Sequence, residues 1–339
     1  MNYILSPTSF FVNELHNPTL GTAGQYFYYL IEKKGLSHKQ LVKRLGAKGF
    51  FSGVKDRNAT TKQWFCSNYP IDERKEKDLT VTFKGMGKER LFVGAHKANA
   101  FEVDVFLDEG EWDNLTKFKP KNELVCNYFG EQRFDKRVND FATSLNEKNY
   151  EKALKIFLTE KSDYDSERSS AIKKTTINNW GDWKTIKESE HVKGTKKEEL
   201  FDFLAAHSKD SDCFEKAFFY VERKSLKEFI KACQSIRFNA ALNDLAEKKR
   251  PNNFFAEINK AKLRMSASKA FPRSLSIEGT EFEKSLGVRR VERKTFFGAS
   301  KFKAKKISGN KVTLVFELAR GSYATVFLEF LKSYLASKK

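Results

Sequence analysis

The first 110 residues alternate short apolar runs with turn residues, which is the pattern of a series of β-strands. In AFEVDVFLD, residues 100–108, apolar side chains recur at every second position, which indicates a strand with one buried face. Short β-type runs bounded by turn residues predict strands in five other segments: FFVNEL, QYFYYLIEK, KGFFSGV, KQWFCSNY and LTVTFKG. This part of the chain is therefore expected to form a β-sheet.

A helix is predicted within this strand-rich region. Ser37 and Gln40 have the spacing of a capping box, in which two side chains satisfy backbone N–H groups at the start of a helix. Leu41, Val42 and Leu45 then supply a short apolar stripe. We expect the helix to begin just after Ser37.

From about residue 137 to 290 the apolar positions change to helical spacing, as in NYEKALKIFL and EELFDFLAA. In the segment 226–249, one helix face is predicted to hold Leu226, Phe229, Ile230, Cys233, Ile236 and Ala240. The segment 160–184 is polar enough to hold a long exposed loop. The pattern predicts a second, mostly helical domain.

A strand and a helix return near the C-terminus. KVTLVFEL, residues 311–318, reads as a strand, and the helical stripe after it comprises Val326, Phe327, Phe330, Leu331 and Tyr334. These two elements are too little for a third domain, so we expect them to complete the N-terminal sheet. The predicted fold class is α+β, with one discontinuous domain of residues 1–136 and 291–339 and an insertion at residues 137–290.

The chain is strongly basic. Its 339 residues include 63 Lys and Arg against 44 Asp and Glu, a net charge of +19 spread along the sequence. RNA or DNA is the first partner to consider, because Lys and Arg that neutralise phosphates release counterions. A basic proteome or a solubility role is an alternative source of the charge. A membrane surface is a third reading, but no basic amphipathic helix near a terminus supports it.

The sequence shows no targeting or membrane-spanning segment. The start, MNYILSPTSFFVNEL, lacks a basic region with a long apolar stretch, and no window is long enough to span a bilayer. The four cysteines lack Cys-x-x-Cys spacing, which argues against a zinc site or a disulfide framework. We expect a cytoplasmic protein with reduced thiols and no membrane partner.

Motifs for metals and nucleotide cofactors are absent. GMGKER, residues 85–90, lacks the third Gly of a dinucleotide fingerprint and the Gly-Lys-Ser/Thr of a P-loop, so a hairpin turn is expected there. The five histidines show no metal-ligand spacing, and there is no Gly-x-Ser-x-Gly elbow. We expect neither a metal nor a cofactor.

The segment GVKDRNATTKQ, residues 53–63, places a carboxylate between two cations where a solvated turn would serve. It resembles the Gly-x-Lys-Asp-x-x-Ala-x-Thr-x-Gln signature of the TruD family of tRNA pseudouridine synthases. Three further blocks resemble that family in the same order: LFVGAHKANAFEVDV, NYFGEQRF and GSYAT, at residues 91–105, 127–134 and 321–325. SIRFN, residues 235–239, is a faint echo of a motif in the family's helical insertion.

The chain also departs from the family pattern. Cys126 stands where the family often has Pro before Asn-Tyr-Phe-Gly, and Asp135 stands where it has Gly after Arg-Phe. Arg320 replaces a Pro before the last block. In the N-terminal block Ser9 replaces Asp, and residues 1–8 contain no Lys or Arg where the family has a basic residue.

The resemblance implies a fold and a reaction. The fold is a catalytic domain of pseudouridine synthase type, with a mixed, largely antiparallel sheet and flanking helices, interrupted by an inserted TRUD domain. The reaction is isomerisation of a uridine in tRNA, typically at position 13, to pseudouridine without metal or cofactor. A monomer that acts on tRNA is expected.

The resemblance assigns the role of nucleophile to Asp56. Such a carboxylate must be ionised, which a nearby cation favours. Lys55 belongs to the family signature and ranks above Arg57, which can instead bind phosphate or be a solvated turn charge. Neighbouring side chains on a strand point to opposite faces, so adjacency places neither cation at the carboxylate. Thr61 and Gln63 are expected to hold the Asp56 loop in shape.

Further residues are expected to bind the uridine, which must be flipped out of the tRNA at a cost of roughly a few kcal/mol. The resemblance points to Phe129 as the ring that stacks on uracil, with a core aromatic as the alternative. Asn127 has the donor and acceptor for a uracil edge or for fixing a loop. Ser322 and Tyr323 are expected to close the site, although Ser322 is also a candidate cap for the final helix.

Two other functions are compatible with parts of the sequence. One is an RNA-binding or RNA-folding protein on the same scaffold with little catalysis, against which the intact Asp56, Lys55, Asn127 and Phe129 argue. The other is an unrelated basic hydrolase with a carboxylate mechanism, which needs a second partnered acid that no motif supplies.

Overall fold

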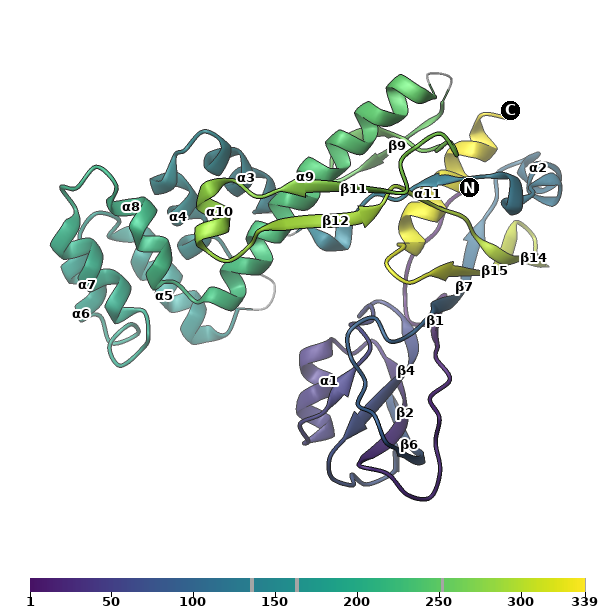
Figure 1. Ribbon diagram of the computed structural model, residues 1–339, viewed down its shortest axis with the longest axis horizontal. Coiled ribbons are helices and arrows are strands. Elements are labelled where there is room, and N and C mark those ends of the chain that lie inside the picture. Colours follow the sequence, from purple (N-terminus) through teal and green to yellow (C-terminus); the bar gives the residue numbers. More distant parts are fainter. Residues whose placement is uncertain (135–136, 162–164, 251–252, 339) are drawn as a thin grey trace. The chain divides into compact units, whose positions relative to one another are not determined.

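The computed structural model describes residues 1–134, 137–161, 165–250 and 253–338 (Figure 1). The chain forms two compact units. The sheet unit comprises Met1–Tyr128, Leu245–Arg273 and Thr295–Lys339. The helical unit comprises Phe129–Asp244 and Ser274–Lys294.

The sheet unit is built on a mixed sheet of nine strands in the order β14-β15-β7-β1-β4-β2-β6-β5, with β3 paired to β4. Strands β1 and β4 run parallel, and the other described pairs in this sheet run antiparallel. The predicted mixed, largely antiparallel sheet is confirmed. Its strands are β1 Phe10–Leu15, β2 Tyr26–Lys34, β3 Phe50–Phe51, β4 Thr60–Ser67, β5 Arg74–Lys75, β6 Leu79–Gly87, β7 Ala98–Phe106, β14 Ser300–Ser308 and β15 Lys311–Ala319.

Two local predictions are also confirmed in this unit. Helix α1, His38–Leu45, follows Ser37, whose side chain accepts from the Gln40 N–H, while the Gln40 side chain accepts from the Ser37 N–H. Strand β15 pairs with β7 along its whole length, so the C-terminal segment does return to the N-terminal sheet.

The strand register fixes which residues share a face of the sheet. One row of paired residues crosses it: Phe316, Phe101, Val12, Thr61 and Lys33, from β15 to β2. Paired residues on neighbouring strands project to the same side of a sheet. The row therefore begins with aromatic rings and ends with a hydroxyl and an ammonium.

Two helices cover the apolar ends of this face. Helix α11, Ala324–Ala336, packs on the β15 end, where the ring centroids of Phe327 and Phe316 are 4.7 Å apart. At the other end Leu41 and Leu45 of α1 join a buried cluster with Ile31 and neighbouring residues of β2, β4 and β6. The polar middle of the face is left for the loop between β3 and β4.

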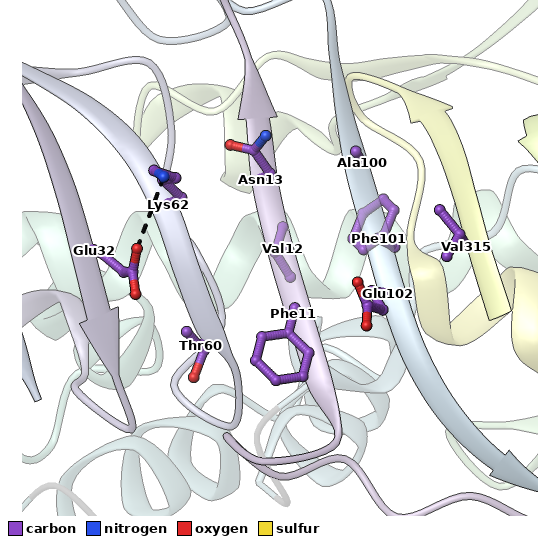
Figure 2. A pocket seen from close by; sticks show the side chains of 10 residues that line it. All are labelled: Phe11, Val12, Asn13, Glu32, Thr60, Lys62, Ala100, Phe101, Glu102 and Val315. Atoms are coloured by element: carbon purple, nitrogen blue, oxygen red, sulfur yellow. Dashed lines mark ion pairs between the residues drawn. The ribbon is translucent and has the colours of Figure 1, made fainter. Parts of the chain in front are cut away.

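The opposite face of the sheet carries a shallow depression of about 370 Å³ (Figure 2). Its lining includes Phe11, Thr60 and Glu102, whose neighbours in sequence project to the first face because side chains alternate along a strand. Lys62 and Glu32 form an ion pair of 3.9 Å beside it (Figure 2).

Smaller elements complete the sheet unit. Strand β8 pairs with β13, and β9 pairs with β10, in two separate ribbons. These elements are α2 Glu111–Lys117, a 3₁₀ turn Pro120–Asn122, β8 Val125–Cys126, β9 Phe255–Ile258, β10 Ala261–Arg264 and β13 Phe296–Phe297.

The helices of the helical unit pack around one apolar core, and the unit also contains an antiparallel ribbon of β11 and β12 (Figure 1). The long helix α9 begins in this unit and ends in the sheet unit. The elements are a 3₁₀ turn Glu131–Arg133, α3 Val138–Asn146, α4 Tyr150–Thr159, α5 Glu167–Asn178, α6 Trp183–Glu188, α7 Glu198–His207, α8 Cys213–Ala217, a 3₁₀ turn Phe218–Tyr220, α9 Arg223–Lys249, β11 Ser274–Glu278, α10 Glu281–Ser285 and β12 Arg290–Lys294.

Three sequence predictions are wrong in detail. The segment 160–184 is not one long loop, because Ser166 caps α5 within it. Residues 85–90 do not form a hairpin turn, since Gly85 to Gly87 extend β6 and β6 pairs with β2 rather than β7. On α9 the residue Ala240 is exposed rather than on the buried face.

The predicted domain limits remain predictions. Residues 135–136 lie outside the described part of the chain, and so does Asp135 of the family comparison. The compact units divide the chain between residues 128 and 129 and place residues 245–273 with the sheet.

Candidate active site

Asp56 lies in the loop between β3 and β4, over the polar middle of the first face. Its side chain is half-buried, and its Oδ1 accepts a hydrogen bond of 2.8 Å from the Asn58 N–H. This Asx-type turn orients the carboxylate. Arg57, next along the chain, is exposed to solvent.

Lys55 points into the protein. Its Nζ lies 2.5 Å from Oε2 of Glu14, and both side chains are buried. The other Glu14 oxygen accepts from the Trp64 N–H at 3.4 Å. The cation that the sequence ranked first therefore pairs with Glu14 of β1 rather than with the neighbouring carboxylate.

Lys33 of β2 supports the Asp56 loop from beneath. Its ammonium donates hydrogen bonds of 2.7 Å to the backbone carbonyls of Asp56 and Leu36, and the residue is only 1% exposed. Burial lowers the pKa of Lys33 to about 8; the Asp56 charge opposes this shift and the Lys55 charge adds to it. A buried positive charge is thus bound to the backbone of the candidate nucleophile.

Thr61 and Gln63 lie on the same face of β4, beneath the loop. Both are fully buried. Among the described residues, neither Thr61 Oγ1 nor the amide atoms of Gln63 have a hydrogen-bond partner. Their predicted support of the loop therefore depends on packing in this structure.

A buried histidine completes the polar layer. His96 Nε2 lies 3.4 Å from the amide nitrogen of Asn99, the residue that pairs with Glu14 across β1 and β7. Burial, with Lys55 nearby, lowers the pKa of His96, while Glu14 acts in the opposite direction. The imidazole is therefore favoured in its neutral form beside the Lys55 and Glu14 pair.

The Asn-Tyr-Phe-Gly signature spans the boundary between the two units. Asn127 is buried in the sheet unit, where its N–H donates 2.9 Å to the Thr295 carbonyl. Phe129 belongs to the helical unit, and its backbone is held at both polar groups by one side chain. Asn239 of α9 accepts from the Phe129 N–H at 2.8 Å and donates to the Phe129 carbonyl at 3.0 Å.

The ring of Phe129 already has a partner on its face. The Arg293 guanidinium of β12 lies 4.2 Å from the ring centroid, and Phe238 meets the ring edge-on at 5.5 Å. The residue is 9% exposed. Stacking on uracil therefore requires the guanidinium to move or the base to share the ring with it.

Ser322 and Tyr323 lie between β15 and α11. The residue at the N-cap of α11 is Tyr323, so the alternative role of Ser322 as that cap is wrong. Both side chains are half-buried. The preceding Arg320 binds the second family block, because its N–H donates to the Lys97 carbonyl and its guanidinium donates to the Gly94 carbonyl.

The sequence matches the family described as tRNA pseudouridine synthase D (TruD) over residues 5–257, more than half of the chain.

The chain belongs to the TruD family.

Similar proteins carry the same name. "Probable tRNA pseudouridine synthase D 1" of Methanococcus maripaludis is 26% identical over 379 residues, which cover 94% of this chain and 96% of that protein. "tRNA pseudouridine synthase D" of Aquifex aeolicus is 27% identical over 395 residues, with 96% of each chain covered. The predicted family is confirmed, and its enzyme class is a tRNA pseudouridine synthase, an isomerase.

A solved structure supports the fold of this TruD-family chain. The crystal structure described for a tRNA pseudouridine synthase D (TruD) from Methanosarcina mazei aligns with a TM-score of 0.61 and 18% identity. The alignment covers 99% of this chain and 93% of that one. The predicted fold class is confirmed by this likeness.

The described residues contain neither a metal-binding cluster nor a membrane-spanning helix. No group of three or more His, Cys, Asp or Glu side chains within them is placed to hold a metal ion. No helix within them is long and apolar enough to cross a bilayer.

The sequence predictions missed four side chains that contact the predicted residues: Lys33 and Glu14 in the sheet unit, and Asn239 and Arg293 in the helical unit. Glu14 left a signal, since it is an acid at a buried position of the alternating strand FFVNEL. Asn239 is the last residue of the faint SIRFN echo. Lys33 and Arg293 left no signal beyond the general excess of cations.

Lys33 gives this TruD-family enzyme a predicted pH dependence. Its pKa of about 8 means that its charge is present below this pH and is lost as the pH rises through it. We expect kcat to fall above about pH 8, because the Asp56 loop then loses the positive charge that is bound to its backbone carbonyl. Single-turnover rates between pH 6.5 and 9.5 would measure this alkaline limb.

The variant Lys33→Met provides the control, since it should be slower and should lack the alkaline limb. An unchanged limb in this variant would assign the titration to another group.

The stability of the protein should change in the opposite sense to kcat. The Lys33 side chain of the unfolded chain keeps its proton up to about pH 10.5, so the free energy of unfolding rises with pH between about 8 and 10.5.

Proposed function

We propose that this TruD-family protein converts uridine 13 of a tRNA to pseudouridine, with Asp56 as the nucleophile acting on a flipped-out base. One observation carries the proposal: the Asp56 carboxylate is half-buried on a loop whose backbone is held by the buried Lys33 ammonium. The Asn58 N–H then orients the carboxylate. An anchored, accessible carboxylate is what nucleophilic catalysis requires.

The reaction rearranges one molecule. The bond between ribose C1′ and uracil N1 breaks, the uracil turns within the site, and C1′ bonds to C5, from which a proton leaves while N1 gains one. Asp56 can attack either the uracil ring or C1′, and both routes return the carboxylate at the end. The sequence and the geometry are compatible with either route.

The remaining site residues are proposed to bind the substrate. Phe129 stacks on uracil once the Arg293 guanidinium moves off the face of its ring. Asn127 binds an edge of the uracil or fixes the loop in which it lies. Arg57 follows Asp56 in the chain, is exposed and is suited to bind a phosphate. The ion pair of Lys55 with Glu14 favours a role in positioning the Asp56 loop. A contact between Lys55 and the substrate would require this ion pair to break.

Two more residues and the domain limits belong to this proposal. Ser322 and Tyr323 close the site from the start of α11. Residues 1–136 and 291–339 form the catalytic domain, and residues 137–290 form the inserted TRUD domain. We also propose that the protein works as a monomer in the cytoplasm on tRNA.

The test uses tRNA transcripts with tritium at C5 of uridine, since C5 must lose its hydrogen when it bonds to C1′. Release of tritium to water by the wild-type protein, followed by mapping of the modified nucleotide to position 13, is the expected result. Tight binding without release from any tRNA would favour the alternative of an RNA-binding or RNA-folding protein.

The net charge of +19 predicts that tRNA affinity depends steeply on salt. If six to ten phosphates are neutralised, the affinity should fall by roughly 10³-fold or more between 50 and 200 mM salt. Filter-binding titrations at several salt concentrations would measure the slope. The variant Arg57→Ala should reduce the slope by about one if Arg57 binds a phosphate, and a flat titration would refute electrostatic binding.

A further inference from the structure

Two loops at the candidate active site expose apolar side chains. Among the described residues, five large apolar side chains are at least 60% exposed, and three of these five lie in the two loops. They are Val54 at 71%, Phe92 at 61% and Val93 at 86%. We call these three residues the apolar rim. Clustered apolar exposure of this kind marks a binding surface rather than an ordinary surface residue.

The rim adjoins Asp56. Val54 precedes Asp56 by two residues, and exposure alternates along this segment because Val54 is exposed, Lys55 is buried and Asp56 is half-buried. Val54 and Asp56 therefore project to the solvent side of the loop. The loop of Phe92 and Val93 is joined to this loop, since the Gly94 N–H donates 2.7 Å to the carbonyl of Ser52.

The second loop is held in a fixed shape. The Ala95 N–H donates 3.0 Å to the Phe92 carbonyl, and Gly94 has a φ of +89°, as the third position of a type II turn requires. The Arg320 guanidinium donates to the Gly94 carbonyl. Val93 therefore stands at the corner of a braced turn, and its exposure does not result from a loose loop.

The surroundings of the rim select its partner. Arg57 follows Val54 by three residues, and the Arg320 guanidinium donates to the Gly94 carbonyl, next along the chain from Val93. Both arginines are exposed and can neutralise phosphates. Flipping a nucleotide uncovers the faces of the bases next to it, and apolar side chains inserted at such steps replace the lost stacking. This surface combines exposed apolar side chains, two exposed guanidinium groups and the candidate catalytic carboxylate. Such a combination fits RNA at a position where neighbouring bases are no longer stacked.

We propose that Val54, Phe92 and Val93 pack against the bases that flank the flipped uridine and hold the RNA in its opened form. The proposal deepens the proposed function and rests on it. Phe92 is the main contact, because its ring can cover a base face. The two valines extend the apolar surface toward Asp56.

The experiment measures tRNA binding and isomerisation separately. Binding is measured with the Asp56→Asn protein, so that the substrate stays unreacted. This parent is compared with a protein that also carries Phe92→Ala and Val93→Ala, which we call the rim variant. The matched control is Phe11→Ala, which removes a partly exposed Phe from the opposite face of the same sheet (Figure 2). The probe is a transcript with 2-aminopurine beside the nucleotide that the tritium assay has mapped.

The rim variant should bind about tenfold or more weakly, in line with the loss of one stacked base, and should show a smaller 2-aminopurine fluorescence change. The ratio of its Kd to that of the Asp56→Asn parent should stay constant between 50 and 200 mM salt, because an apolar contact releases no counterions. Phe92→Trp should restore binding, and Phe11→Ala should match the parent.

Several results would overturn the proposal. One is equal affinity and equal fluorescence change in the folded rim variant and its parent. Another is a rim variant that binds tRNA like its parent but differs from it in sedimentation when no tRNA is present. The rim would then be a contact between copies of this chain. A different result would separate this proposal from the proposed function: wild type releases no tritium, while the Kd of the rim variant for tRNA is raised by the same factor at 50 and 200 mM salt. The apolar contact with RNA would then stand and the proposed catalysis would fail.

Discussion

Asp56→Asn is expected to abolish tritium release from tRNA, with a loss in rate of about a thousandfold or more, because an amide cannot act as the nucleophile. The substitution keeps the shape of the side chain, and the new Oδ1 can still accept from the Asn58 N–H that now binds Asp56. Affinity for tRNA should stay within a few-fold of wild type. Single-turnover release and equilibrium binding on the same preparation would measure both.

The control for this prediction is Asp72→Asn, which neutralises an exposed carboxylate in the loop after β4 of the same unit. This variant should isomerise uridine at the wild-type rate. A folded Asp56→Asn protein that no longer binds tRNA would refute the assigned role, because the residue would then be a binding group. Substantial tritium release by the variant would also refute it.

Lys55→Met is expected to have the largest effect on stability, a loss of about 3–5 kcal/mol in the free energy of unfolding. Its ammonium is 2.5 Å from Glu14, and both side chains are buried, so the substitution leaves a carboxylate without its counter-ion in the core. Denaturant unfolding at pH 7 would measure the loss. The Asp56 loop also loses an anchor, so kcat should fall as well.

Two variants make this prediction specific. Lys62→Met removes the cation of an exposed pair with Glu32, at 3.9 Å, and should cost less than about 1 kcal/mol. Combining Lys55→Met with Glu14→Leu removes both charges and should recover most of the stability, because neither partner remains uncompensated. Equal losses in Lys55→Met and Lys62→Met would contradict a buried pair.

Much of the fold followed from the sequence, because the controlling interactions are local. A short β-type run located β1, period-two alternation located β7, and the Ser37 and Gln40 capping box located the start of α1. Where local patterns were weak the predictions were wrong. Helix α5 is polar, so its composition predicts an exposed loop, although Ser166 is a residue type that caps helices.

The family motifs likewise identified the enzyme class, since they are short runs of contiguous residues. The pairing of strands was not accessible in this way. Nothing local to β6 shows that it pairs with β2, or that β1 and β4 run parallel, because these choices depend on how distant segments bury their apolar faces together.

The motifs around Asp56, Asn127 and Phe129 were enough to assign the chain to one enzyme family, and its net charge of +19 favours RNA as a partner. The groups that surround these three residues depend on the folded arrangement of the chain. This arrangement paired Lys55 with Glu14, placed Lys33 beneath the Asp56 backbone and bound Phe129 to Asn239, contacts that span 41, 23 and 110 residues of sequence. The physical reason is that the partner of a charge or a hydrogen-bonding group is set by strand register and helix packing, which join residues that are far apart in the chain.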